Sequence, residues 1–109
     1  MAIGILASEI FSDMFGTAAM RGVFGERAFL ARCVETEAAL ARAQSRLGII
    51  PVDAAAAISQ AASLIIERTE TLDLVRLKRE TENVGYPILP LVRQIAEKAG
   101  EAGRWLHWG

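Results

Sequence analysis

The only histidine of the chain and both of its tryptophans lie within the last five residues, which are Trp105, Leu106, His107, Trp108 and Gly109. Histidine is the side chain that most readily gives and takes a proton near neutral pH. His107 is therefore the first candidate for proton transfer or for binding a carboxylate. The competing interpretation is structural, because a histidine between two tryptophans can serve in packing with its ring hydrogen-bonded to a backbone carbonyl. The spacing alone leaves both interpretations open.

The other reactive side chains do not indicate metal, nucleotide or thiol chemistry. A metal site needs several His, Cys or carboxylate ligands at matched spacing, which one histidine and one distant cysteine do not supply, so we predict no metal. The glycine patterns that bind phosphates and dinucleotides are absent, and we predict no cofactor. Cys33, surrounded by Phe29, Leu30 and Val34, is expected to be a small core residue rather than a nucleophile.

A second group of polar residues surrounds the end of a charged helix. The run from Arg76 to Glu82 is typical of a solvated helix face with ion pairs at i,i+3 and i,i+4. Thr81, Asn83 and Tyr86 offer hydrogen-bonding groups where this helix ends. Polar residues at a helix end usually act as caps, so these three alone do not define a site.

Composition excludes several classes of protein. The net charge is −1, with 12 basic and 13 acidic residues interspersed, so we predict no nucleic-acid partner. Hydrophobic residues make up 52% of the chain, which suggests that another domain or subunit buries part of its surface. No apolar run approaches the length of a membrane span, and no signal peptide is recognised at residues 1–7. A single cysteine favours a reducing compartment, most simply the cytoplasm.

The hydrophobic pattern predicts an all-α fold of antiparallel helices. A short helix is expected around residues 17–24 and a long one over 26–47, ended by Gly48. A second long helix starts at Pro51 and Asp53, a third runs through 72–84 until Gly85, and a fourth through 85–99. Gly100 and Gly103 are expected to break the chain before its aromatic end. The apolar face of the long helix is predicted to contain Phe29, Cys33, Leu40 and Leu47, widened by Leu30, Val34, Ala38 and Ala41.

Two stretches resemble the opening of enzymes of the fumarase/aspartase superfamily, also called the fumarate lyase superfamily. The first is FSDMFGTAAMRGVFGERAFLARCVETEAALARAQSRLGIIP, with a short helix and then a long helix that ends in LGIIP. The second, GYPILPLVRQIAEKAGEAGRWLHWG, resembles the part that runs into the first signature motif, a His-x-Gly followed by Ala-Thr-Ser/Thr-Gln-Asp. The resemblance covers nearly the whole chain. It is greatest to the branch of 3-carboxy-cis,cis-muconate cycloisomerase and adenylosuccinate lyase, and the HWG form favours the cycloisomerases.

This resemblance implies an architecture. Residues 1–109 would be the N-terminal helical domain of a three-domain, mostly helical subunit, ending inside the first signature motif. A central helical bundle and a C-terminal domain would lie downstream, together with the serine that acts as base. Members of the superfamily are homotetramers whose active sites are shared between subunits. They act on small carboxylate substrates, without a redox cofactor, by addition or elimination across a carbon–carbon bond next to the carboxylate.

The resemblance also suggests roles for individual residues. His107 matches the signature histidine and would bind or protonate the polar end of the substrate, while Gly109 would allow close approach of the loop. Asn83, Tyr86 and Trp108 are further candidates for substrate binding. Tyr86 falls near the position where the cycloisomerase branch often has Asn and adenylosuccinate lyases have a catalytic histidine, which speaks against a standard adenylosuccinate lyase.

Three functions follow as hypotheses. The first is a cycloisomerase-like enzyme that lactonises an intermediate of aromatic-compound degradation. The second is a lyase that splits a C–N or C–O bond and releases fumarate or a relative of it. The third, from another class, is a non-catalytic helical module that uses its apolar surface to oligomerise. In the first two cases, residues 1–109 alone are expected to show no turnover.

Overall fold

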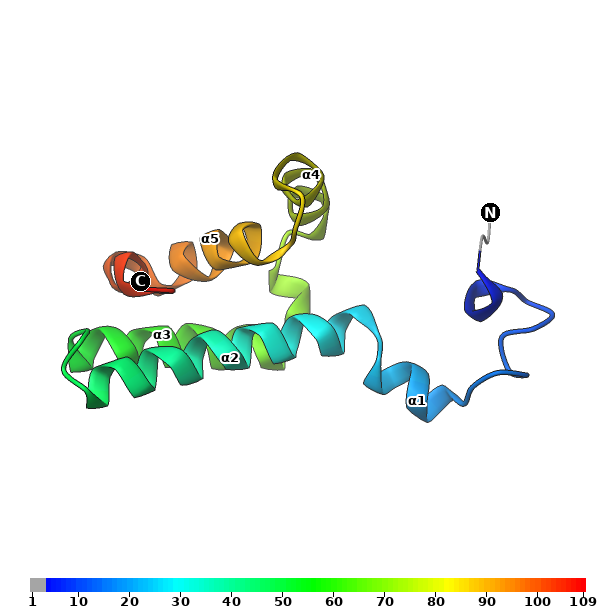
Figure 1. Ribbon diagram of the computed structural model, residues 1–109, viewed down its shortest axis with the longest axis horizontal. Coiled ribbons are helices and arrows are strands. Elements are labelled where there is room, and N and C mark those ends of the chain that lie inside the picture. Colours follow the sequence, from blue (N-terminus) through cyan, green and yellow to red (C-terminus); the bar gives the residue numbers. More distant parts are fainter. Residues whose placement is uncertain (1–3) are drawn as a thin grey trace.

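The computed structural model describes residues 4–109, which form helices and no strands, as the all-α prediction requires. The two longest helices, α2 and α3, lie antiparallel, and α5 with the following 3₁₀ helix η3 lies over them (Figure 1). The chain begins as an arm that extends away from this bundle (Figure 1). The elements in chain order are η1 (Ile5–Ala7), α1 (Ala18–Val23), α2 (Glu26–Arg46), α3 (Val52–Glu67), η2 (Thr69–Thr71), α4 (Leu74–Val84), α5 (Ile88–Ala99) and η3 (Gly100–Trp105).

Helix α2 has the predicted length, but it buries a different face from the one predicted. Phe29 and Leu40 are partly exposed, Leu47 is 76% exposed, and Cys33 is only half-buried. The residues that were expected at the edge of the apolar face, among them Leu30, Val34 and Ala41, form its centre instead. Helix α3 packs against this stripe, which lies one position after Phe29, Cys33 and Leu40 in the sequence and includes several alanines. Alanines there allow the two helices to approach closely. The buried residues of α2 are Leu30, Ala31, Val34, Glu37, Ala38 and Ala41.

The turn between α2 and α3 forms as its sequence predicts. Gly48 has a φ of +72°, a conformation that glycine adopts without a steric penalty. This lets the N–H of Ile49 donate to the carbonyl of Gln44 at 2.9 Å and end the helix. Pro51 then precedes the first residue of α3, where its missing N–H costs nothing.

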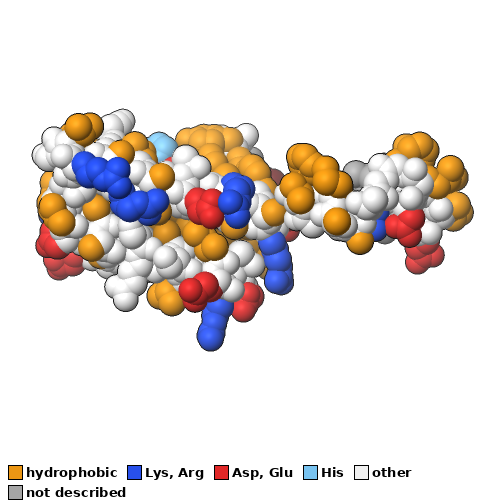
Figure 2. All heavy atoms as spheres, turned by 90° about the horizontal axis from the view of Figure 1, so that it is seen from below, with side chains coloured by type: hydrophobic (Ala, Val, Ile, Leu, Met, Phe, Trp, Pro, Cys, Tyr) orange, Lys and Arg blue, Asp and Glu red, His pale blue; other side chains and the backbone are white. Residues whose placement is uncertain are grey.

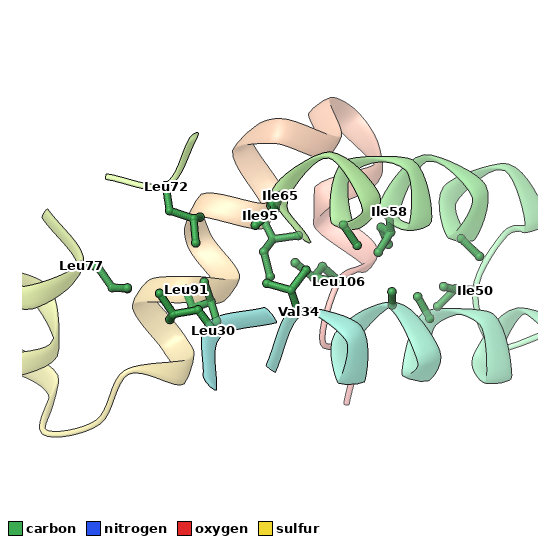
Figure 3. Close-up of a cluster of buried hydrophobic side chains, with 14 residues drawn as sticks. Leu30, Val34, Ile50, Ile58, Ile65, Leu72, Leu77, Leu91, Ile95 and Leu106 are labelled. Carbon is green, nitrogen blue, oxygen red and sulfur yellow. The ribbon is translucent and has the colours of Figure 1, made fainter. Parts of the chain in front are cut away.

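The core lies between α2, α3 and α5. Val34, Ile65 and Ile95 meet at its centre, each fully buried, and Leu106 points in beside them from the C-terminal end (Figure 3). A second group, in which Leu30 meets Leu91, lies toward α4 (Figure 3). Helix α3 contributes many small residues to this core, as α2 does, so its interior is narrow and closely packed.

Polar contacts join α4 to α5. The side chain of the buried Gln94 accepts from the N–H of Asp73 at 2.9 Å and donates to the carbonyl of Asp73 at 3.0 Å. Arg76 donates to both oxygens of Glu97, at 2.8 and 2.9 Å, and to Glu80 at 2.8 Å. These hydrogen bonds raise the pKa of Arg76 and lower the pKa of Glu97. The predicted i,i+4 pairs of this charged face are present, between Arg76 and Glu80 and between Lys78 and Glu82. The prediction of a solvated face did not include the contact of Arg76 with Glu97, which connects two helices.

The two glycines after α5 behave differently from each other. Gly100, with a φ of +66°, ends α5 as predicted, but the backbone continues at once into the 3₁₀ helix η3, and Gly103 lies inside it without breaking the chain. Gly103 has a packing role: a Cβ built there would lie 2.4 Å from the carbonyl oxygen of Ala96. Glycine therefore lets η3 lie directly against the last turn of α5. Gly103 was expected only to break the chain, so this contact was not predicted.

The N-terminal arm carries apolar side chains that the bundle does not cover. No residue of α1 is buried, and the hydrophobic side chains of this narrow extension are visible at its surface (Figure 2). Arg21 holds the arm together by donating to the carboxylate of Asp13 at 2.8 Å and to the carbonyl of Ser12 at 3.0 Å. The arm gives the molecule its elongated dimensions of 53 × 29 × 22 Å. Its exposed apolar residues include Ile10, Phe11, Met14, Phe15, Met20, Val23 and Phe24.

Candidate active site

Leu106 fixes the position of the C-terminal turn. Its side chain is only 7% exposed and inserts into the core beside Val34 (Figure 3). Its N–H donates to the carbonyl of Gly103 at 3.1 Å, which closes η3. A buried leucine directly before His107 therefore ties the histidine backbone to the bundle.

His107 itself has an unusual backbone conformation. Its φ is +53°, and it is the only non-glycine residue with a positive φ in the described part of the chain. The left-handed region costs an ordinary residue about 1–2 kcal/mol. Such strain persists only where the surroundings hold it, and it often marks a functional position.

The imidazole of His107 contacts one carboxylate. Its Nδ1 lies 2.8 Å from Oε1 of Glu37, in the middle of α2. A carboxylate in its ionised form only accepts hydrogen bonds, so this contact favours the form of the ring with a proton on Nδ1. Glu37 is 7% exposed, whereas the side chain of His107 is 55% exposed. The pair thus has a buried acceptor and an accessible ring.

The second oxygen of Glu37 is also buried, and no group among residues 4–109 donates a hydrogen bond to it. A buried carboxylate costs several kcal/mol unless a partner compensates it. The same charge acts on Cys33, one turn earlier on α2: burial raises the pKa of this thiol, and the Glu37 carboxylate raises it further. Cys33 packs against the core, as predicted, but it is only partly buried.

A further hydrogen bond holds the residue after the histidine. Nε2 of Gln44 donates to the carbonyl of Trp108 at 2.7 Å. Glu37 and Gln44 are two helical turns apart on α2, so both hydrogen bonds come from one side of that helix. The left-handed turn is therefore held at His107, at Leu106 before it and at Trp108 after it.

The two tryptophans do not enclose the histidine. Their ring centroids are 4.8 Å apart with an angle of 49° between the ring planes, so Trp105 and Trp108 pack on each other. The guanidinium of Arg104 lies 5.6 Å from the centroid of the Trp105 ring, within the range of a cation–π contact. The structural interpretation expected a packed ring bonded to a backbone carbonyl, whereas the ring of His107 is half exposed and its partner is a carboxylate.

The structure brings together only some of the predicted site residues. Trp108 and Gly109 adjoin His107 at the end of the chain, and both are exposed. Asn83 lies at the end of α4 and Tyr86 in the connection to α5, also exposed. This connection and the C-terminal turn lie at opposite ends of α5 (Figure 1), so within one chain Asn83 and Tyr86 do not join the histidine.

Sequence reasoning missed Glu37 and Gln44. One signal for Glu37 was present: it lies three residues after Val34 and four before Ala41, so it occupies the buried stripe of α2. A carboxylate on such a stripe usually has a polar partner. The identity of that partner could not be predicted, since His107 is 70 positions away in sequence.

Other kinds of site were also sought within residues 4–109. No group of three or more His, Cys, Asp or Glu side chains gathers closely enough to hold a metal ion there. In the same part of the chain, no helix is both long and apolar enough to cross a membrane.

Comparison with curated proteins identifies relatives along the whole chain. It is 37% identical to the 3-carboxy-cis,cis-muconate cycloisomerase of Pseudomonas aeruginosa over 94% of its residues. It is 36% identical to the adenylosuccinate lyase of Methanocaldococcus jannaschii over 87%, and 32% identical to the N-acetyl-S-(2-succino)cysteine lyase of Dickeya dadantii over 100%. The chain spans only 22%, 20% and 23% of these three proteins, respectively. No protein-family model matches it.

Solved structures give the same relationship. The fumarate lyase from Mesorhizobium sp. BNC1 is 57% identical over 86% of this chain and 21% of its own, with a TM-score of 0.76. The β-carboxy-cis,cis-muconate cycloisomerase from Acinetobacter calcoaceticus is 31% identical over 92% of this chain and 23% of its own, with a TM-score of 0.82.

Fold and site together define an all-α bundle with a strained, carboxylate-bonded histidine at one end. The chain is homologous to the N-terminal region of fumarate lyase superfamily enzymes, which include cycloisomerases and lyases. This confirms the resemblance found in the sequence.

Proposed function

We propose that this chain forms the N-terminal helical region of a longer enzyme that catalyses reversible addition or elimination next to a carboxylate. One observation carries the proposal: His107 has a left-handed backbone conformation and its Nδ1 lies 2.8 Å from the Glu37 carboxylate, while half of its side chain stays exposed. A strained, half-exposed histidine bonded to a buried acid suits proton transfer or anion binding better than packing.

The geometry suggests how His107 acts. With Nδ1–H donated to Glu37, Nε2 on the other side of the ring is the nitrogen available to a substrate. A protonated ring donates from Nε2 to a substrate carboxylate, or to the negative charge that builds up when a proton leaves the neighbouring carbon. A donor placed in advance at such a charge stabilises the transition state. Trp108 and Gly109 are proposed to border the same substrate.

The first candidate reaction is that of a 3-carboxy-cis,cis-muconate cycloisomerase, a lactonisation. The TM-score of 0.82 to the Acinetobacter cycloisomerase and the 37% identity to the Pseudomonas enzyme support it. The second candidate is a lyase that releases fumarate or a relative of it. The 57% identity to the Mesorhizobium fumarate lyase favours this alternative.

The proposed assembly is a homotetramer with active sites shared between subunits. The uncovered apolar side chains of the N-terminal arm support association with other subunits or domains. In such an assembly, Asn83 and Tyr86 would serve a different active site from His107, because α5 separates them within one chain (Figure 1). The rival function, a non-catalytic oligomerisation module, uses the same arm but gives no role to the strained histidine.

A hybrid enzyme tests the proposal. The region of the Mesorhizobium fumarate lyase that aligns with this chain is replaced by residues 1–109, and the hybrid is assayed for fumarate release and for lactonisation of 3-carboxy-cis,cis-muconate. We expect turnover in the hybrid and none in the 109-residue chain alone. His107→Asn should lower kcat of the hybrid by about 100-fold or more, the usual scale for the loss of an acid or of one anion-stabilising donor.

Asparagine is chosen because it tolerates the left-handed region better than most residues, so the backbone can keep its conformation. The control is Leu106→Ala, which opens a cavity next to the histidine and should lower the melting temperature while the chemical step persists. If His107→Asn keeps near-normal turnover in a folded hybrid, the proposed role of the histidine is wrong. A folded hybrid without any turnover would instead favour the non-catalytic module.

A further inference from the structure

Glu37 occupies a position where packing does not require a carboxylate. It lies on the buried stripe of α2 among Val34, Ala38 and Ala41 and is 7% exposed. An apolar side chain of similar length would fill this place, and exchanging a buried ionic group for an apolar one is often neutral or stabilising. Within residues 4–109, the hydrogen bond that Glu37 makes with its side chain is the one to His107. The carboxylate therefore serves the histidine rather than the fold.

The backbone around the ring is held independently of Glu37. Leu106 is anchored in the core, and the carbonyl of Trp108 accepts a hydrogen bond from Gln44 at 2.7 Å. These two contacts place the His107 backbone, but neither acts on the imidazole. The orientation and the tautomer of the ring are left to the contact between Nδ1 and Oε1 of Glu37.

We propose that Glu37 is a positioning residue: it holds His107 in the tautomer with the proton on Nδ1 and thereby presents Nε2 to the substrate. The inference rests on the proposed function of His107. A histidine without partners carries its proton mainly on Nε2, so without Glu37 the neutral ring would for much of the time hold its single proton on the substrate-facing nitrogen and could not accept a proton there. The buried second oxygen of Glu37 fits this role. No other group among the described residues donates a hydrogen bond to the carboxylate, so no other donor competes with the imidazole for it.

The tautomer can be read directly by NMR. The chain has one histidine, so a protein labelled with ¹⁵N-histidine gives the signals of a single imidazole. At a pH where the ring is neutral, we expect the folded 109-residue wild type to show the Nδ1–H tautomer. Glu37→Met should shift the ring toward the Nε2–H tautomer. The matched control is Glu35→Met, which removes the same charge from the same helix but leaves Glu37 in place. It should keep the wild-type pattern.

The wild-type spectrum is informative even if Glu37→Met does not fold, since an Nε2–H tautomer in the folded wild type overturns the proposal by itself. If the variant folds, as judged by circular dichroism, an unchanged tautomer in Glu37→Met overturns it too. These results do not depend on catalysis, so they are separate from a failure of the proposed function.

Turnover of the hybrid completes the test. Glu37→Met should lower kcat by about 10-fold or more with a smaller change in KM, because losing the orienting partner of a catalytic histidine affects the chemical step. Glu35→Met should leave both constants unchanged. Normal kcat in Glu37→Met, in a hybrid whose rate falls on His107→Asn, overturns the positioning role. Normal kcat in His107→Asn overturns the proposed function and the inference with it.

Discussion

Replacing Gly103 by alanine tests how closely η3 must lie against α5. An added Cβ would lie 2.4 Å from the carbonyl oxygen of Ala96 and 2.8 Å from its Cα and carbonyl carbon. All three atoms are backbone, so no side chain can rotate away. Relief to 3.0 Å, below which such contacts essentially do not occur, requires a displacement of 3.0 − 2.4 = 0.6 Å.

The cost follows from what the displacement disturbs. Overpacking of a close-packed region typically costs about 1–3 kcal/mol, and three backbone contacts place Gly103→Ala near the upper end, at about 2–3 kcal/mol. The shift also draws Leu106 out of the core. With a urea m-value of about 1.5 kcal/mol per M, the unfolding midpoint should fall by about 1–2 M.

The assay is urea unfolding followed by far-ultraviolet circular dichroism. The control is Gly22→Ala in α1, where nothing lies within 4 Å of the added Cβ and where the helix does not touch the core. That variant should keep the midpoint of the wild type. An unchanged midpoint in Gly103→Ala would refute the packing argument, because η3 would then not be in contact with α5 in solution.

Three further predictions concern individual contacts. Alkylation of Cys33 near pH 7.5 should be slower in the folded chain than in urea, because burial and a neighbouring carboxylate raise the pKa of its thiol; equal rates would contradict this. Arg76 lowers the pKa of Glu97, so the ionised pair stabilises the fold above the ordinary carboxyl pKa of 4.5, and this contribution is lost as the pH falls through the lower, folded value. Melting temperatures of the wild type and Glu97→Gln should therefore differ at pH 7 and converge in acid, whereas a constant difference would argue against the ion pair. Gln44→Leu removes the donor to the carbonyl of Trp108, a loss of about 1 kcal/mol, and should increase hydrogen exchange near the C-terminus without changing exchange in α5.

Local chemistry predicted the helices well. Gly48 and Gly85 end α2 and α4, and prolines precede α3 and α5, because these residues act through their own backbone preferences. Packing between elements was harder to predict. Phe29 and Leu40 are larger than the alanines beside them, so they dominate the hydrophobicity pattern of the sequence. Helix α3 nevertheless packs against the stripe that contains the alanines, because small side chains allow the two helices to approach closely.

The candidate site was only half predictable. His107 was recognised by residue type and by resemblance to a motif, neither of which needs a structure. Its backbone conformation, its bond to Glu37 and the contact of Trp108 with Gln44 arise only when the end of the chain meets α2. Asn83 and Tyr86 show the opposite case: they are close to each other in sequence, but α5 separates them from the histidine.

The hydrogen bonds of the C-terminal turn have a consequence for the order of folding. They join residues that are 70 and 64 positions apart, while the helices and their turns depend on neighbours in sequence. Contacts between distant residues form slowly, since the loop entropy is lost before the contact is gained. The helices can therefore assemble before His107 reaches its left-handed conformation, and during synthesis α2 leaves the ribosome well before its partner. A destabilised variant would thus retain its helical spectrum while the histidine has already lost its place.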